Sequence, residues 1–312
     1  MTIFWSILLN NVLPLSVMIA IGITLQRAFS LDIKTLSKLN FYLFSPAVIF
    51  RLLYTTDLTL QLVGKVLLFF LILMLMLYGA VEITVRIRGL KGGKRATMRN
   101  SVLFYNSANY GIPLNQLAFA ANPFTLSVQL LIMVMQSLVP NTYGIYSVNA
   151  HRSNGREVLR TIASQPVIYA IPLALLLHGF HIPLPGFLAT PLDYVADAFF
   201  GTALVTLGVQ LGSMKWSVRS LLMVDVLLSS GLRLLIGPLL ATLIVWGMDL
   251  TIGIDSMMAK ALIVSSAVPT SLSSVLLAVE FDNEPEFASQ VVLVSTVFSI
   301  VTVTGVIYLL HV

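Results

Sequence analysis

The stretch Asn106-Ser-Ala-Asn109-Tyr-Gly111-Ile-Pro113 interrupts a hydrophobic segment in the first half of the chain, and Ser265-Ser-Ala-Val-Pro269-Thr-Ser271 interrupts another in the second half. Proline removes a backbone donor and clashes with the carbonyl four residues earlier, so both segments are expected to be interrupted near their middles, and Gly111 adds freedom of φ in the first. A break at membrane depth is tolerated mainly where it is buried in protein or lines a watery cavity. The two breaks are therefore the first candidates for a functional site.

The composition is that of a membrane protein. The chain is 57% hydrophobic and 10% charged, with a mean hydropathy of +0.93, whereas soluble domains carry about a quarter charged residues. Apolar runs of roughly 20 residues recur along it, as α-helical spans require and barrel strands do not. We expect an all-α integral membrane protein with ten spans, at residues 4–26, 36–54, 60–84, 97–119, 124–148, 160–179, 188–211, 219–246, 257–279 and 286–309.

The positive charges predict the orientation in the membrane. Most of the 18 lysines and arginines lie in alternate loops, around residues 27–38, 86–99, 152–160 and 215–219. Short loops rich in Lys and Arg face the cytoplasm, so we expect both termini outside. The basic loop 86–99 has no interleaved aromatic residues, and topology explains it better than nucleic-acid binding does.

The chain has features of an inverted repeat. The polar stretch 151–157 divides it into halves of five spans, so the second half lies upside down relative to the first. Residues 129–144 align without gaps on residues 290–305, with Gln and Gly shared at the two ends. Each break lies roughly 21–23 Å into its span at ~1.5 Å per residue, one entered from the cytoplasm and one from outside. This predicts two discontinuous helices that cross near the midplane.

The chemistry of the breaks suits an anion. The half-helix after each break begins with N–H groups that have no intrahelical partner and carry partial positive charge. Secondary transporters place their sites at such breaks. The alternative is that the prolines only kink their helices and the polar residues only hydrogen-bond a neighbouring helix. The candidate binding residues at the breaks are Asn106, Asn109, Tyr110, Gly111, Pro113, Ser265, Ser266, Pro269, Thr270 and Ser271.

Three further binding candidates lie on other spans. Gln129 and Asn141 share the fifth span with Gln136, and a proline before Asn141 suggests another local break facing the crossing; hydrogen bonding between helices explains them equally well. Arg233 lies near the middle of the eighth span, where a charge is costly and marks a functional candidate. The alternative to a functional role is a structural ion pair between Arg233 and Asp225, or between Arg233 and an acid on another helix.

Five motifs of the chain are typical of one known family. They are Asn106-x-x-x-x-Gly111-Ile-Pro113, Arg233-Leu-Leu-Ile-Gly-Pro238, Ala267-Val-Pro269, Ala278-x-Glu280-Phe281 and the helix from Gln290 to Ser299. Together they resemble the auxin efflux carrier family, the bacterial relatives of the plant PIN-type auxin carriers. That family is similar in fold to the bile acid/sodium symporters. The resemblance covers essentially all 312 residues.

The resemblance implies ten helices in two inverted five-helix repeats, with broken helices four and nine crossing at Pro113 and Pro269 and with Asn106 as the asparagine of the crossing. It also implies a homodimer held through a scaffold. The plant proteins carry a long hydrophilic loop after the fifth helix, whereas residues 149–159 form a short one here, so regulation through that loop is not carried over. The implied scaffold comprises residues 1–58 and 151–215, and the implied mobile transport domain comprises residues 59–150 and 216–312.

We therefore expect a secondary transporter, and an exporter, of a small organic anion that works by elevator-like alternating access. The resemblance implies auxin-like aromatic acids in plants and dicarboxylates such as malate and malonate in bacteria. A channel or membrane sensor on the same fold, and a sodium-coupled organic-anion symporter, are the alternatives.

An enzyme is not expected, because the chain has no His-Glu-x-x-His, no cysteine nucleophile and no P-loop. We expect no cofactor, no metal and no nucleic acid. Asp193 and Asp197 fit solvated acids better than a proton or cation site. The expected partners are the substrate, membrane lipid and a second copy of the chain, and the expected location is the bacterial inner membrane.

Overall fold

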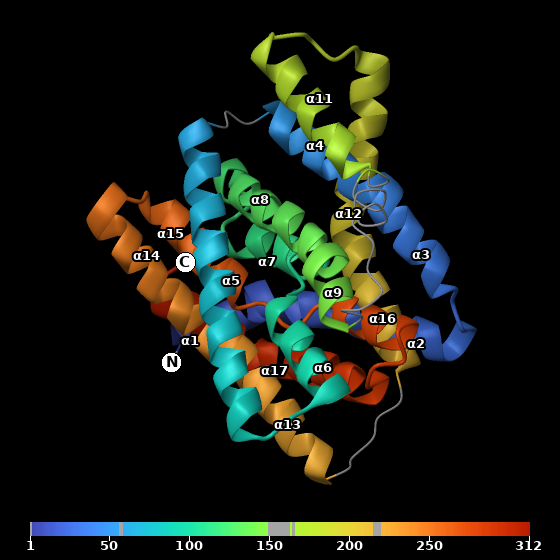
Figure 1. The fold of residues 1–312 in the computed structure, drawn as a ribbon. Helices are drawn as coiled ribbons and strands as arrows, with labels where there is room; N and C mark the ends of the chain where they lie inside the picture. Colours follow the sequence, from blue (N-terminus) through green and yellow to red (C-terminus); the bar gives the residue numbers. More distant parts are fainter. Residues whose placement is uncertain (1, 56–58, 149–162, 164–165, 215–219) are drawn as a thin grey trace.

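The computed structural model describes residues 2–55, 59–148, 163, 166–214 and 220–312, and every element in these ranges is helical (Figure 1). Within them, extended segments pair at an isolated antiparallel bridge between Tyr105 and Thr270. Long apolar runs favour this architecture, because in lipid a helix satisfies the backbone groups within its own segment. The prediction of an all-α protein is confirmed.

The helices follow the expected segments, several of which contain a π-helical turn or a break. In the first half they are α1 (Thr2–Ile7), η1 (Leu8–Val12), α2 (Leu13–Phe29), α3 (Ile33–Leu39), η2 (Asn40–Phe44), α4 (Ser45–Thr55), α5 (Leu60–Ile87), α6 (Gly92–Leu103), α7 (Gly111–Ala118), α8 (Pro123–Val139), η3 (Pro140–Gly144) and α9 (Ile145–Val148). In the second half they are α11 (Val167–Gly179), α12 (Gly186–Ser213), α13 (Ser220–Gly231), η4 (Leu232–Ile236), α14 (Gly237–Ile252), α15 (Ser256–Ser266), α16 (Ser273–Glu280) and α17 (Pro285–Leu310). The start of the sixth expected span, residues 160–162 and 164–165, lies outside the described residues.

Five helical stretches of the described chain are long and apolar enough to cross a membrane: Ile3–Phe29, Leu60–Ile87, Gly186–Ser213, Leu222–Ile252 and Pro285–Leu310. They contain 26 to 31 residues, whereas a span needs about 20. Shorter apolar helices occupy Pro123–Val139, Ile168–Gly179 and Ser256–Ser266. The protein is therefore a multi-pass membrane protein.

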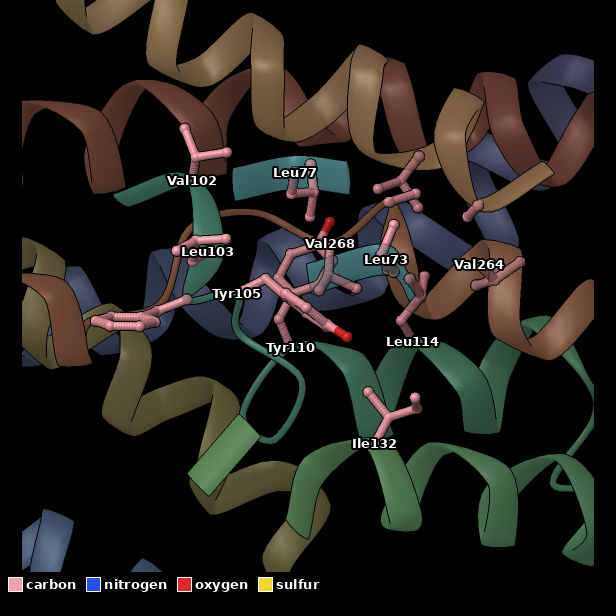
Figure 2. Packing of buried hydrophobic residues seen from close by; sticks show 14 of the residues in the cluster. Leu73, Leu77, Val102, Leu103, Tyr105, Tyr110, Leu114, Ile132, Val264 and Val268 are labelled. Atoms are coloured by element: carbon pink, nitrogen blue, oxygen red, sulfur yellow. The ribbon is translucent and has the colours of Figure 1, made fainter. Parts of the chain in front are cut away.

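The helices pack around two apolar clusters. α4, α11 and α12 pack together beside α2 and α3 (Figure 1), around a smaller cluster that includes Ile49 and Phe199. α5, α6 and α13 to α17 surround a larger cluster that includes Leu73, Val102 and Val264 (Figure 2). α7, α8 and α12 contribute side chains to both clusters, and α2 contributes Leu15 and Ile19 to the larger one.

α2 and α12 cross at short range because both carry glycine at the crossing. A Cβ on Gly22 would overlap the carbonyl of Val205 and come within 2.8 Å of the Cα of Gly208. A Cβ on Gly208 would overlap the carbonyl of Ile19. Small residues let helix backbones approach closely in a membrane, where packing drives association. The two helices are therefore in direct backbone contact.

The first and last helices also meet. The ring of Phe4 in α1 lies 6.0 Å from the ring of Tyr308 in α17, measured between ring centres. Because Phe4 is near the start of the chain and Tyr308 is near its end, the two ends of the chain lie at the same end of the helix bundle.

An exposed ion pair joins α4 to α12. Arg51 lies 2.8 Å from a carboxylate oxygen of Asp197 and 3.6 Å from one of Asp193. The two aspartate side chains are 56% and 68% exposed, which agrees with solvated acids. Exposed pairs of this kind contribute about 0–1 kcal/mol to stability.

Candidate functional site

The segment between α6 and α7 lies against the segment between α15 and α16. The N–H of Asn106 donates to the carbonyl of Pro269 at 2.8 Å, and the N–H of Ser271 donates to the carbonyl of Phe104 at 2.8 Å. Figure 2 shows Val268, next to Pro269, among the residues packed beside this pairing. The two interruptions expected from the sequence are thus both present, and they meet.

The broken end of α6 has a hydrogen-bond donor for each of its last four carbonyls. A helix that ends in lipid leaves these groups without intrahelical partners, and each unmet group is costly. The donors are Phe104 N–H to Asn100 at 2.9 Å, Thr270 Oγ1 to Ser101 at 2.9 Å, Arg233 Nη1 to Val102 at 3.3 Å, and Gln136 Nε2 to Leu103 at 3.1 Å. Three of the four are therefore side chains brought in from other elements.

Further side chains hold the extended segments. Gln129 in α8 donates from Nε2 to the carbonyl of Ser107 at 2.8 Å, and the N–H of Thr270 donates to the hydroxyl of Ser295 in α17 at 3.2 Å. A Cβ on Gly111 would lie 2.5 Å from Gln129 Nε2, so a larger residue there would displace the Gln129 amide. The side chains of Gln129 and Thr270 therefore donate hydrogen bonds to backbone carbonyls at the first break.

Arg233 is fully buried in η4. Its guanidinium donates to the carbonyls of Val102 and Ser266, which belong to the last turns of α6 and α15. Asp225, the ion-pair partner that the sequence offered, pairs instead with Arg88 at 2.9 Å. No carboxylate in the described ranges forms an ion pair with Arg233.

Both half-helices begin with donors that have no partner. In the part of the chain that the structure describes, no hydrogen bond engages the N–H of Ala108 or Asn109, just before α7, or that of Leu272, just before α16. The buried side-chain amide of Asn106 also makes no hydrogen bond to a described residue. These groups are available to a ligand.

A cavity of about 90 Å³ lies where these donors gather. Its wall carries no charged side chain among the described residues, only neutral polar and apolar ones. It is lined by Ser37, Ser45, Tyr105, Asn106, Ser107, Ala108, Asn109, Met133, Gln136, Ser137, Gln210, Ser271, Leu272, Ser273 and Leu276. The cavity therefore brings together both breaks, α8 and the helices α3, α4 and α12.

Among the lining residues that gave no signal in the sequence are Ser37 in α3, Ser45 in α4 and Gln210 in α12. Gln210 donates from Nε2 to the hydroxyl of Ser37 at 3.2 Å, so the two helices are linked at the cavity wall. Isolated Ser and Gln in apolar helices usually serve helix–helix hydrogen bonding, and here they do that as well.

The other sequence candidates are dispersed. Tyr110 lines a separate cavity of about 360 Å³ between α2, α12 and α17, and its hydroxyl accepts from Ser299 at 3.1 Å. Ser265 is buried in α15, and Pro113 is buried in the first turn of α7. The side chain of Asn141, in η3, lies outside the described residues.

Comparison with known proteins identifies transporters. A family described as "Membrane transport protein" matches residues 147–307. An "Uncharacterized transporter" of Methanothermobacter thermautotrophicus is 24% identical over 303 residues, which cover 94% of this chain and 95% of that protein. Both descriptions are of transporters rather than enzymes. With the motifs at the two breaks, these matches establish that the chain belongs to the membrane transport protein family, that of the auxin efflux carriers.

Proposed function

We propose that the protein is a secondary transporter of a small organic anion, and that the cavity between the two breaks is its binding site. The observation that carries the proposal is the set of unpartnered backbone N–H groups that both half-helices bring to this one cavity. A helix N-terminus carries roughly half a positive charge and binds anions in many proteins. A carboxylate offers only hydrogen-bond acceptors, which complement these unpartnered N–H groups.

The cavity favours a small substrate. A volume of about 90 Å³ has room for a few water molecules or one short carboxylic acid. The amides of Asn106 and Asn109 and the hydroxyls of Ser271 and Ser273 can donate to it without burying a full charge. Short dicarboxylates, which the family resemblance implies for bacterial members, are the first compounds to test.

The proposed fold is ten membrane segments in two inverted repeats, with broken helices four and nine crossing at the cavity. Helices α1 to α4, α11 and α12 form the proposed scaffold, and the other helices after α4 form the proposed transport domain. The packing supports this division, because the side chains that hold the breaks come from α8, η4, α17 and the second break itself. The scaffold supplies the opposite wall of the cavity.

The proposed mechanism is an elevator. The transport domain would carry the breaks and the bound anion past the scaffold, so that the cavity opens to each side in turn. A homodimer joined through the scaffold, and net export of the anion, complete the proposal as the family resemblance implies them.

Flux through proteoliposomes tests the function. Saturable, concentrative uptake of labelled malonate would support a carrier, whereas non-saturable flux that only follows the gradient would support a channel. Dependence on a sodium gradient would favour the symporter. Binding without any flux would favour a sensor.

Asn106→Ala is expected to weaken substrate binding by about 1–3 kcal/mol, roughly tenfold to a hundredfold in Kd, because it strands the ligand group that the amide meets. Folding should survive, since the amide has no described partner to lose. Titration of the purified variant by calorimetry measures the effect. The matched control is Asn10→Ala, which removes an exposed asparagine bonded to Ser6. Wild-type affinity in Asn106→Ala would remove this residue from the site.

The proposed orientation, with both termini outside, can be tested with single cysteines because the chain has none of its own. Ser30→Cys, in the exposed turn after α2, should react with an impermeant reagent only after the cells are permeabilised. His311→Cys, after α17, should react in intact cells. The reverse pattern would invert the topology.

A further inference from the structure

Arg233 carries a full positive charge that is completely buried and has no ion-pair partner among the described carboxylates. Burying an unpaired charge is very costly, so other groups must compensate for it. Its contacts identify those groups. The guanidinium bonds the carbonyls of Val102 and Ser266 and lies over the ring of Tyr105, 4.4 Å from the ring centre.

The two carbonyls belong to helix C-termini. Val102 is the second-last residue of α6 and Ser266 is the last residue of α15. Each helix C-terminus carries roughly half a negative charge, so two of them together offset about one positive charge. The ring face of Tyr105 adds a cation–π contact. The charge of Arg233 is therefore matched by the helix ends, without a carboxylate.

The local sequence makes room for this contact. Gly237 lies one turn after Arg233, and a Cβ there would come within 2.9 Å of the guanidinium Nη2 and 3.3 Å of the carbonyl of Ser266. Glycine at this position thus lets the guanidinium reach the end of α15. Tyr105 lines the ligand cavity, whereas Arg233 lies behind it and does not.

We propose that the guanidinium of Arg233 is a tethered counter-cation that joins the C-termini of both broken helices and thereby aims the N-termini of α7 and α16 at the cavity. Half-helix C-termini in other transporters coordinate a soluble cation; here a side chain takes that place. Arg233 is a positioning residue, which acts on the ligand through the two helices. The effect on the ligand rests on the proposed function, whereas the effect on the fold does not.

The test compares Arg233→Lys, Arg233→Met and Arg233→Ala with the wild type by thermal unfolding in detergent, without ligand. If charge compensation matters, Arg233→Lys should melt several degrees above Arg233→Met, although both melt below the wild type. If Arg233 only fills space, Arg233→Met should melt as high as Arg233→Lys or higher, and that result would overturn the proposal. The melting temperatures can be measured in unpurified membranes, so a variant that folds poorly still contributes a low melting temperature to the comparison.

Chemical rescue gives a second readout. Low millimolar guanidinium or methylguanidinium should raise the melting temperature of Arg233→Ala, because the ion can enter the vacated site between the helix ends. It should not raise that of Arg233→Met, in which the site is filled, or that of Arg51→Ala, in which the lost arginine was partly exposed. Equal responses of all three variants would contradict a specific cation site.

Gly237→Ala tests the geometry with Arg233 left in place. The added methyl group should displace the guanidinium and lower the affinity for malonate on the order of tenfold, while Gly231→Ala, whose Cβ meets nothing within 4 Å, should bind as the wild type does. Equal affinities in the two variants would count against the proposal. Failure of malonate to bind the wild type would count against the substrate class instead, and the ligand-free melting order would still decide the role of Arg233.

Discussion

Gly208→Ala is expected to destabilise the protein by about 3 kcal/mol, the upper end of the usual range for overpacking. The new methyl group would overlap the carbonyl of Ile19 and lie within 2.8 Å of the Cα of Gly22. Both obstacles are backbone, which cannot rotate aside as a side chain can. α2 and α12 would have to separate, and the proposed scaffold would lose its backbone contact at this crossing.

Gly201→Ala on the same helix is the matched control. A Cβ at Gly201 would meet only the Cε of Met18, at 3.7 Å, which is an ordinary contact. Replacing a helical glycine by alanine without a clash is worth about 0.5–1 kcal/mol of stability. Thermal unfolding in one detergent should therefore move the two variants in opposite directions from the wild type. Similar melting temperatures for both would mean that the helix crossing is looser than the glycine contacts indicate.

Joining α4 to α8 by a disulfide is expected to abolish transport. The hydroxyl of Ser45 lies 4.0 Å from the sulfur of Met133, and both residues line the cavity. α4 and α8 are therefore neighbours there, and Ser45→Cys with Met133→Cys can be joined by oxidation or, where the two sulfurs stand too far apart for a direct bond, by a short bis-thiol reagent that forms a disulfide with each. α4 belongs to the proposed scaffold and α8 to the proposed transport domain. An elevator cannot run while the two are joined, so flux should fall to the level of empty liposomes on oxidation and return on reduction.

The control places the cross-link inside the proposed scaffold. Asn40 donates from Nδ2 to the hydroxyl of Thr206 at 2.7 Å, between η2 and α12. Asn40→Cys with Thr206→Cys, joined by the same treatment, should leave transport running, because both positions lie on one side of the proposed movement. Full flux in the oxidised Ser45/Met133 variant would show that these helices need not move past each other, and the elevator proposal would be abandoned.

The helices and their breaks could be predicted because they depend on neighbouring residues. An apolar run of about 20 residues is enough to indicate a helix in lipid, and Gly111 with Pro113 is enough to indicate where one is interrupted. The polar residues Asn106, Asn109 and Ser271 could be assigned to a cavity on the same basis, because an interrupted helix exposes the groups beside the break. All three line the cavity that the structure contains.

The hydrogen-bond and ion-pair partners of single polar residues could not be predicted, because these partners depend on which distant segments of the chain meet. The sequence marks Thr270 and Arg233 as polar at membrane depth, but nothing in it indicates that their donors reach the carbonyls of Ser101 and Val102. Asp225 is near Arg233 in sequence, yet its partner is Arg88, which follows the end of α5. Tertiary approach, rather than local spacing, decides such pairs.

The donors at the end of α6 also constrain how the chain is assembled during synthesis. Thr270 and Arg233 belong to the second half of the chain, whereas the carbonyls that they serve belong to the first half. A ribosome delivers α6 and α7 to the membrane well before residue 233 exists. In that interval the carbonyls of Ser101 and Val102 must remain bound to water or to other proteins, since lipid offers them no donor. The membrane-embedded form of the break is completed only when the nascent chain has passed residue 270.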